Sequence, residues 1–135
     1  MATLSVFIHG NPAPQGSKRH IGGGRMIESS KHVRPWRQEI IGVLRAENVQ
    51  FSGPVAVSLK FHLPFRKSDL RKDGTPKHEG TQHHFSRPDI DKLARAVLDG
   101  LELSGVISDD GRVCSLTATK VRDTCPGVQI NVTPV

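Results

Sequence analysis

The sequence predicts a single α+β domain in which helices cover one side of a β-sheet. Two observations predict this class. The chain has 135 residues, which is enough for one core and leaves little room for a second. Segments with strand-like or helical patterns follow one another in the order strand, helix, strand, helix, strand, strand, with no internal repeat. We therefore expect residues 1–135 to fold as one unit.

The first three expected elements are a strand, a helix and a second strand. Residues 3–9 alternate loosely and end at a Gly-Asn-Pro-Ala-Pro segment, because proline cannot continue a strand ladder. Residues 33–48 place apolar side chains on one side with helical spacing, and Pro35 suits the first turn. Trp36 is expected to anchor this helix in the core. Residues 55–63 alternate apolar and polar side chains, which predicts a strand with one buried face.

The C-terminal part contains the second helix and two further strands. The helix is expected from residue 89 or 90 to about residue 104, with apolar side chains three and four positions apart. Residues 113–121 and 128–132 are expected to be strands, and the turn between them predicts an antiparallel hairpin. Residues 66–86 are polar and basic, which predicts a long loop that is either a functional flap or an insertion.

The charge of the chain indicates an anionic partner. The net charge is +6 and the isoelectric point is about 9.8. Residues 1–88 carry 14 Lys/Arg against 6 Asp/Glu, whereas residues 89–135 carry 5 against 7, so the positive excess lies in the N-terminal two-thirds. Tyrosine is absent and there is one tryptophan, which argues against an aromatic platform for single-stranded nucleic acid.

Composition also bounds the cellular setting. No apolar run approaches the ~20 residues of a membrane span, and the N-terminus has no secretion-signal pattern, so we expect no membrane partner. Cys114 and Cys125 form no metal motif, and free thiols in a reducing cytoplasm are favoured over a disulfide.

Four carboxylates are the main candidates for chemistry. Asp89 and Asp91 stand where the second helix begins, and Asp109 and Asp110 follow the turn after that helix. If they converge, they repel one another unless a cation neutralises them, and a few oxygen ligands suit Mg²⁺ or Mn²⁺. Such ions hold the attacking water and the leaving oxygen in phosphodiester hydrolysis.

Simpler roles exist for each of these acidic residues. Asp89 is a suitable N-cap, and Asp91 complements the positive end of the helix dipole. Asp109, Asp110 and the following glycine also suit an ordinary polar turn. Arg95, one turn beyond Asp91, either meets transition-state charge or orients a carboxylate, or it forms an ion pair along the helix with an aspartate.

The basic residues of two segments are candidates for holding a nucleic-acid backbone. Residues 15–30 surround three glycines and form either a flexible loop or an irregular hairpin, acting as a phosphate-contacting arm or as a solvated linker. The second segment is the loop of residues 66–86. The candidates are Lys18, Arg19, Arg25, Arg66, Lys67, Arg71 and Lys72. The alternative for each is a solvated surface, and we expect only some of them to touch DNA.

These motifs together resemble the RusA family of Holliday junction resolvases, which is common in phages and prophages. The resemblance rests on Arg-Pro-Asp-Ile-Asp-Lys-Leu at residues 87–93, Arg-Ala-Val-Leu-Asp-Gly-Leu at residues 95–101, and Gly-Val-Ile-Ser-Asp-Asp at residues 105–110. It extends to the Gly-Asn-Pro-Ala-Pro-Gln-Gly turn at residues 10–16. The acidic signature is far more specific than a bare Asp-x-Asp pair.

The resemblance implies a site and an assembly. It makes Asp89, Asp91 and Asp110 the Mg²⁺ ligands and the active site, and it places Arg95 where the family usually has an essential lysine. Arginine keeps the charge but not the shape of the ammonium group. The family's members are homodimers with a mixed sheet, in which two sites make paired incisions in a four-way junction.

The leading hypothesis is therefore a Mg²⁺-dependent endonuclease that hydrolyses phosphodiesters of branched DNA in recombination and repair, in a bacterial or phage-infected cell. The alternative is a DNA-binding module of the same fold without catalysis, which the arginine at position 95 allows. A phage structural protein would fit the basic charge but would leave the carboxylates unexplained.

Overall fold

A computed structural model describes residues 3–16, 18–20, 26–28, 31–77, 82–83 and 85–135. Its centre is a mixed sheet in the order β1-β7-β4-β6-β5, in which only the β4–β6 pair is parallel. The strands are β1 (Leu4–His9), β7 (Gly127–Pro134), β4 (Val55–Leu63), β6 (Val113–Arg122) and the two-residue β5 (Gln82–His83). The expected strands are thus confirmed within about two residues at each end.

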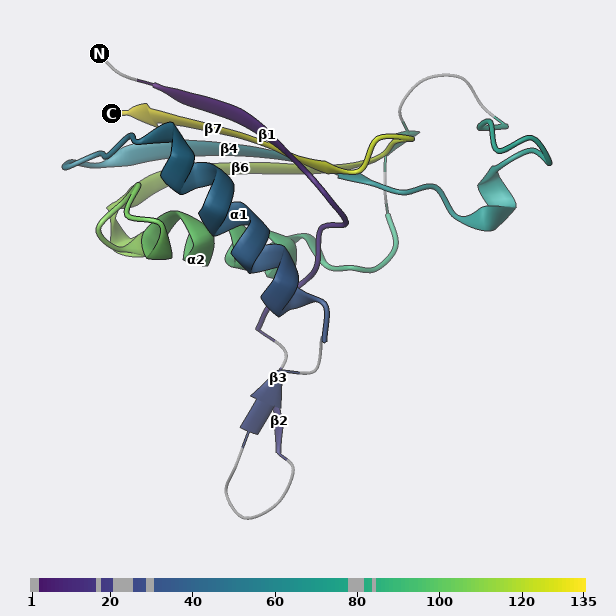
Figure 1. The fold of residues 1–135 in the computed structure, drawn as a ribbon, viewed down its shortest axis with the longest axis horizontal. Helices are drawn as coiled ribbons and strands as arrows, with labels where there is room; N and C mark the ends of the chain where they lie inside the picture. Colours follow the sequence, from purple (N-terminus) through teal and green to yellow (C-terminus); the bar gives the residue numbers. More distant parts are fainter. Residues whose placement is uncertain (1–2, 17, 21–25, 29–30, 78–81, 84) are drawn as a thin grey trace.

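Both long helices lie against the same face of this sheet (Figure 1). α1 (Val33–Glu47) and α2 (Ile90–Leu103) have nearly the expected bounds, and they approach closely at Gly100. A Cβ atom there would lie 2.6 Å from Cγ2 of Ile40, so the glycine permits the contact. The α+β class with a mixed sheet and helices on one side is therefore confirmed.

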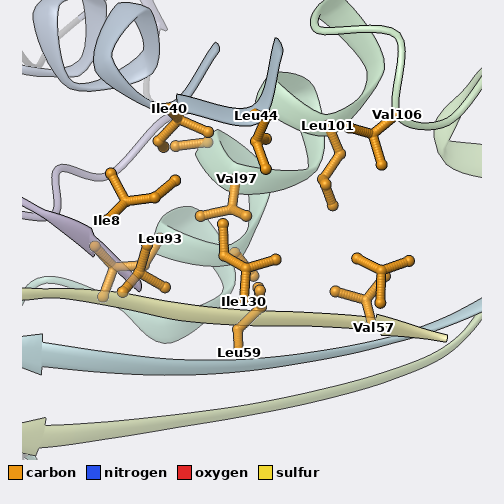
Figure 2. Packing of buried hydrophobic residues seen from close by; sticks show 14 of the residues in the cluster. Ile8, Ile40, Leu44, Val57, Leu59, Leu93, Val97, Leu101, Val106 and Ile130 are labelled. Carbon is orange, nitrogen blue, oxygen red and sulfur yellow. The ribbon is translucent and has the colours of Figure 1, made fainter. Parts of the chain in front are cut away.

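The core lies between the helices and the inward faces of the central strands (Figure 2). Alternate residues of β4 from Val55 to Leu63 are buried, as the period-2 pattern predicted. Trp36 is 5% exposed, which confirms that it packs in the core. The largest fully buried side chains include Phe61, Ile8, Ile40, Leu44, Leu59, Leu93, Leu101, Ile107 and Ile130.

The expected hairpin between the last two strands is wrong. β7 inserts between β1 and β4, and β6 pairs with the opposite edge of β4. Val128, Ile130 and Val132 are all fully buried, which fits a position between two strands and under the helices. The turn pattern at residues 123–127 marks a change of direction, but a local turn signal does not determine which strand β7 pairs with.

Two smaller features interrupt the segments expected to be loops. β2 (Lys18–His20) and β3 (Met26–Glu28) pair antiparallel, so the hairpin alternative holds for the first basic segment. This hairpin projects from the helix side of the molecule (Figure 1). Residues 66–86 contain the short 3-10 helix η1 (Lys67–Asp69) and the strand β5.

Two further expectations concern the membrane and the thiols. Among the helices that the structure describes, none is both long enough and apolar enough for a membrane crossing. Cys114 and Cys125 are both free and exposed, as the sequence indicated.

Candidate functional site

Two cations of β6 hold the segment that leads into α2. Lys120 donates through Nζ to the main-chain oxygens of Ser86 and Pro88, each at 2.8 Å. Arg122 is only 4% exposed and donates to Oγ of Ser86 at 3.0 Å. The chain is therefore fastened to the sheet immediately before Asp89.

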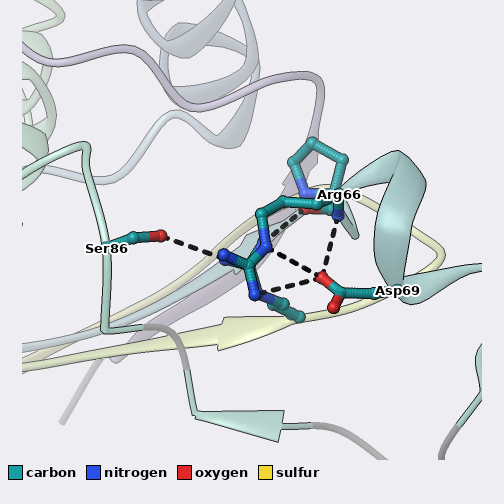
Figure 3. Close-up of polar contacts among 5 residues, drawn as sticks. Arg66, Asp69 and Ser86 are labelled. Atoms are coloured by element: carbon teal, nitrogen blue, oxygen red, sulfur yellow. Dashed lines mark hydrogen bonds and ion pairs between the residues drawn. The ribbon is translucent and has the colours of Figure 1, made fainter.

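The buried Arg122 also joins this segment to the end of β4 (Figure 3). Its guanidinium donates to the main-chain oxygen of Pro64 at 3.3 Å and lies 3.7 Å from Oδ2 of Asp69. Asp69 accepts a second contact from Nε of Arg66 at 3.1 Å, and this hydrogen bond is the main reason that the pKa of Asp69 is lowered. Arg66 is thus engaged within the fold.

Asp89 and Asp91 lie exposed at the start of α2. Asp89 occupies the N-cap position, but its side chain makes no capping hydrogen bond, so the capping role proposed from the sequence does not engage its carboxylate. Asp91 lies in the first turn and contacts Nζ of Lys92 at 2.9 Å. The hydrogen bond from Lys92 lowers the pKa of Asp91, so this carboxylate is ionised at neutral pH.

Asp110 lies at the other end of α2. It begins the 3-10 helix η2 (Asp110–Arg112), directly before β6. Asp109 accepts a hydrogen bond from the main-chain N–H of Gly111 at 2.8 Å, which is the polar turn that the sequence allowed. Because α2 has 14 residues, its ends are about 20 Å apart. The carboxylates expected to meet are therefore separated along one chain.

This separation means that one chain does not assemble the expected three-carboxylate centre. Among the residues that the structure describes, no three His, Cys, Asp or Glu side chains lie close enough to hold a metal ion together. Asp89 and Asp91 remain together at one end, and Asp110 is exposed at the other. Exposed carboxylate oxygens of this kind suit Mg²⁺, which binds few protein ligands and keeps several waters.

Arg95 lies one turn beyond Asp91 and packs against Gly16. A Cβ atom on Gly16 would lie 2.6 Å from Nη1 of Arg95, and the φ of Gly16 is +114°. Glycine therefore leaves the space that the guanidinium occupies. Within the described residues, Arg95 forms no ion pair with Asp91 or Asp99, so its alternative role along the helix is not seen.

Gln15 joins the segment after β1 to both helices. It is 7% exposed, and its Nε2 donates to Oδ2 of Asp99 while its Oε1 accepts from Nη1 of Arg37 at 2.6 Å. Its main-chain N–H also donates to the oxygen of Lys92 at 2.9 Å. These contacts fix residues 10–16 beside the first turns of α2.

A cleft of about 800 Å³ opens next to Asp89. It lies between residues 9–14, the first half of α1 and residues 87–92. Half of its lining residues are apolar or glycine, including four prolines and Trp36, and the other half are polar or charged. A pocket of this size and lining is large enough for a nucleotide.

The candidate DNA-binding residues lie on two peripheral segments. Lys18 and Arg19 belong to β2, and Arg25 lies outside the described residues. Lys67, Arg71 and Lys72 are exposed on the segment that follows β4. This second segment projects beyond one end of the sheet, as Figure 1 shows.

The residues predicted from the sequence to form the site did not include Lys120, Arg122 and Gln15, whose contacts position the segments around it. A signal for the first two exists, since Leu116, Ala118, Lys120 and Arg122 fall on one face of a strand. Two cations that continue a face directed toward the helices indicate buried hydrogen bonding rather than a solvated edge. Gln15 has no such signal, because its partners come from two other segments.

Comparison with known families identifies the family of this chain. The family described as Endodeoxyribonuclease RusA matches residues 9–133, which is nearly the whole chain and includes every carboxylate discussed above. The chain therefore belongs to the RusA family, as its motifs indicated, and this family is one of endodeoxyribonucleases, which are hydrolases that act on DNA. A search of curated proteins finds no match.

Proposed function

We propose that this protein is a Mg²⁺-dependent endonuclease that cuts four-way DNA junctions in recombination and repair. The observation that carries the proposal is the exposed pair Asp89 and Asp91 at the start of α2, within a chain matched by the RusA family over residues 9–133. The carboxylate of Asp89 is not used to cap the helix, and that of Asp91 is exposed and contacts only the neighbouring Lys92 among the described residues, so both have oxygens available to a cation.

The chain supplies carboxylate ligands for the metal, a positively charged side chain for the phosphate, and a contact that holds the main chain before Asp89 in place. Asp89 and Asp91 would hold Mg²⁺ together with an Asp110 carboxylate, and Mn²⁺ would suit the same oxygen ligands. When bound in such a site, magnesium acts as a Lewis acid on the phosphate and lowers the pKa of a bound water. Arg95 directs its positive charge toward the non-bridging oxygens of the phosphate, and Lys120 keeps the main chain before Asp89 in place.

The position of Asp110 favours a site shared between two copies of the chain. Because α2 separates Asp110 from Asp89 and Asp91 in one chain, a second copy running in the opposite direction would bring its own Asp110 to the pair. A two-fold dimer would then carry two complete sites, which suits paired incisions in a symmetric junction.

The outer edge of β6 is the surface that this dimer would use. Among the described residues, β5 pairs only with Val121 and Arg122, so the edge from Val113 to Lys120 has no strand partner. Leu116, on this stretch, is 45% exposed. Antiparallel pairing of β6 with its copy brings the start of one strand, next to Asp110, toward the end of the other, where Lys120 contacts Pro88.

The first test is cleavage of synthetic four-way junctions with and without Mg²⁺. We expect wild-type protein to cut only with the metal, and Asp89→Asn, Asp91→Asn or Asp110→Asn to bind the junction without cutting. Asp73→Asn, in an exposed turn after η1, is the matched control and should cut normally. Junction binding by wild-type protein without any metal-dependent cutting would favour a non-catalytic DNA-binding module instead.

The second test mixes two inactive variants. If Asp110 acts in the partner's site, a heterodimer of Asp91→Asn and Asp110→Asn chains has one site with both defects and one intact site. Random mixing then restores nicking to about a quarter of wild-type activity, since half the dimers are mixed and each has one working site. If all three carboxylates act within one chain, every site keeps one defect and the mixture stays inactive.

A further inference from the structure

The cleft beside Asp89 has apolar walls, which a metal-binding role does not explain. Pro12, Pro14, Pro35 and Trp36 contribute apolar surface to its walls, and at residues 87–89 it reaches Asp89 of the candidate metal site. A phosphodiester backbone needs charge and hydrogen bonds rather than apolar walls. A flat ring with an apolar face fits these walls better.

One side of the cleft comes from a single face of α1. His32, Pro35, Trp36 and Glu39 all line it, at the three- and four-residue spacing that places side chains in a row. Arg87 and Lys92 lie at the end of the cleft where α2 starts. Positive charge at that end and the apolar surface of the prolines and Trp36 suit a nucleotide whose phosphate lies near Arg87 and Lys92 and whose base contacts the apolar walls.

Glu39 is the only acidic residue among the four on this face. It is exposed, and among the described residues it has no ion pair and no side-chain hydrogen bond. A bare carboxylate on the face that meets DNA repels phosphate unless it accepts a hydrogen bond from the ligand. Carboxylates accept from the amino group of cytosine, and adenine carries an amino group of the same kind, whereas thymine has none.

We propose that this cleft binds one unstacked nucleobase next to the phosphodiester that is cut, with Glu39 accepting a hydrogen bond from an exocyclic amino group of that base. The inference rests on the proposed function, because it takes branched DNA as the ligand. A base at a branch point costs less to extrude than one inside a continuous duplex, since the stack of base pairs is interrupted where the arms meet. The cleft thus gives a junction nuclease a local preference for adenine or cytosine over thymine.

The single tryptophan allows occupancy of the cleft to be measured without catalysis. Trp36 is the only tryptophan in the chain, there is no tyrosine, and its ring lines the cleft. We expect its fluorescence to be quenched when metal-free protein binds an unlabelled four-way junction, with binding followed separately by anisotropy of a labelled junction. Saturated binding with unchanged Trp36 emission would overturn the proposal.

An abasic nucleotide moved one position at a time around the branch point identifies the base. At one position the abasic junction should bind about tenfold more weakly and lose the quenching, because a stacked base is removed. Equal affinity and equal quenching at every position would exclude a bound base. Quenching by a protein that never cuts with Mg²⁺ would overturn the nuclease proposal while supporting the cleft.

Glu39→Gln tests the hydrogen bond, with Glu47→Gln as a control of the same charge at the other end of α1. Wild-type protein should cut junctions with adenine or cytosine at the identified position about tenfold faster than those with thymine. Glu39→Gln should largely lose this preference, because its amide both donates and accepts, and Glu47→Gln should keep it. The same preference in all three proteins would remove Glu39 from base selection.

Discussion

Replacing Lys120 by methionine tests whether the β6 cations organise the site. The substitution keeps the length of the side chain but removes the donor to the oxygens of Ser86 and Pro88, each at 2.8 Å. Hydrogen bonds from a charged donor contribute about 1.5–3 kcal/mol each, and water replaces part of this in a half-buried place, so we expect the free energy of unfolding to fall by about 2 kcal/mol. Urea unfolding followed by Trp36 fluorescence measures this.

The cleavage rate of the Lys120→Met protein should fall by more than its loss of stability accounts for. The released oxygens lie on both sides of Arg87, directly before Asp89, and a shift of about 1 Å at a catalytic group costs roughly a hundredfold in rate. Cleavage is measured well below the temperature of unfolding, so that all the protein is folded. Lys60→Met, at an exposed position of β4 next to β6, is the control and should change neither quantity. Wild-type cleavage by the Lys120→Met protein would refute the idea that this contact positions the carboxylates.

Two further predictions concern the packing and the acid stability of the fold. Gly100→Ala should destabilise the protein by about 1–3 kcal/mol because its Cβ would lie 2.6 Å from Ile40, whereas Gly42→Ala, with nothing within 4 Å, should stabilise it by roughly 0.5–1 kcal/mol; thermal unfolding distinguishes them. Partial burial raises the pKa of Asp123, but the hydrogen bond with His62 at 2.7 Å, the main-chain N–H groups of Cys125 and Thr124 and attraction to His62 together outweigh burial, so the folded-state pKa is lowered. The resulting stability is present above about pH 4 and is lost as the pH falls through the folded-state value, so Asp123→Asn should flatten the acid limb of stability against pH measured by urea unfolding. An unchanged acid limb in that variant would show that the contact with His62 contributes nothing.

Local patterns predicted the elements of this fold well. Alternation gave β4 its bounds, and helical spacing located α1 and α2 within a residue or two. The pairing of strands was harder to predict, because it depends on which inward face is buried by both helices. β7 fills the centre of the sheet with Val128, Ile130 and Val132, although its turn suggested an edge hairpin.

The sequence predicted which residue types form the site but not how they are arranged in space. The motif at residues 87–93 identified the exposed carboxylates and the family. It did not reveal that α2 separates Asp110 from them, although the length of the expected helix already implied about 20 Å. The cleft was not foreseen either, since it forms from three segments that meet only through tertiary contacts such as those of Gln15.

The central place of β7 has a consequence for how the chain reaches its native state. On one side it is the only described neighbour of β1, and on the other it pairs along β4 from Val55 to His62. During synthesis from the N-terminus, β1 therefore waits for a partner until residues 127–134 have emerged from the ribosome. If synthesis stopped before residue 127, the main-chain N–H and C=O groups of β1 that pair with β7 would have no partner. Such a fragment should aggregate or be degraded rather than fold.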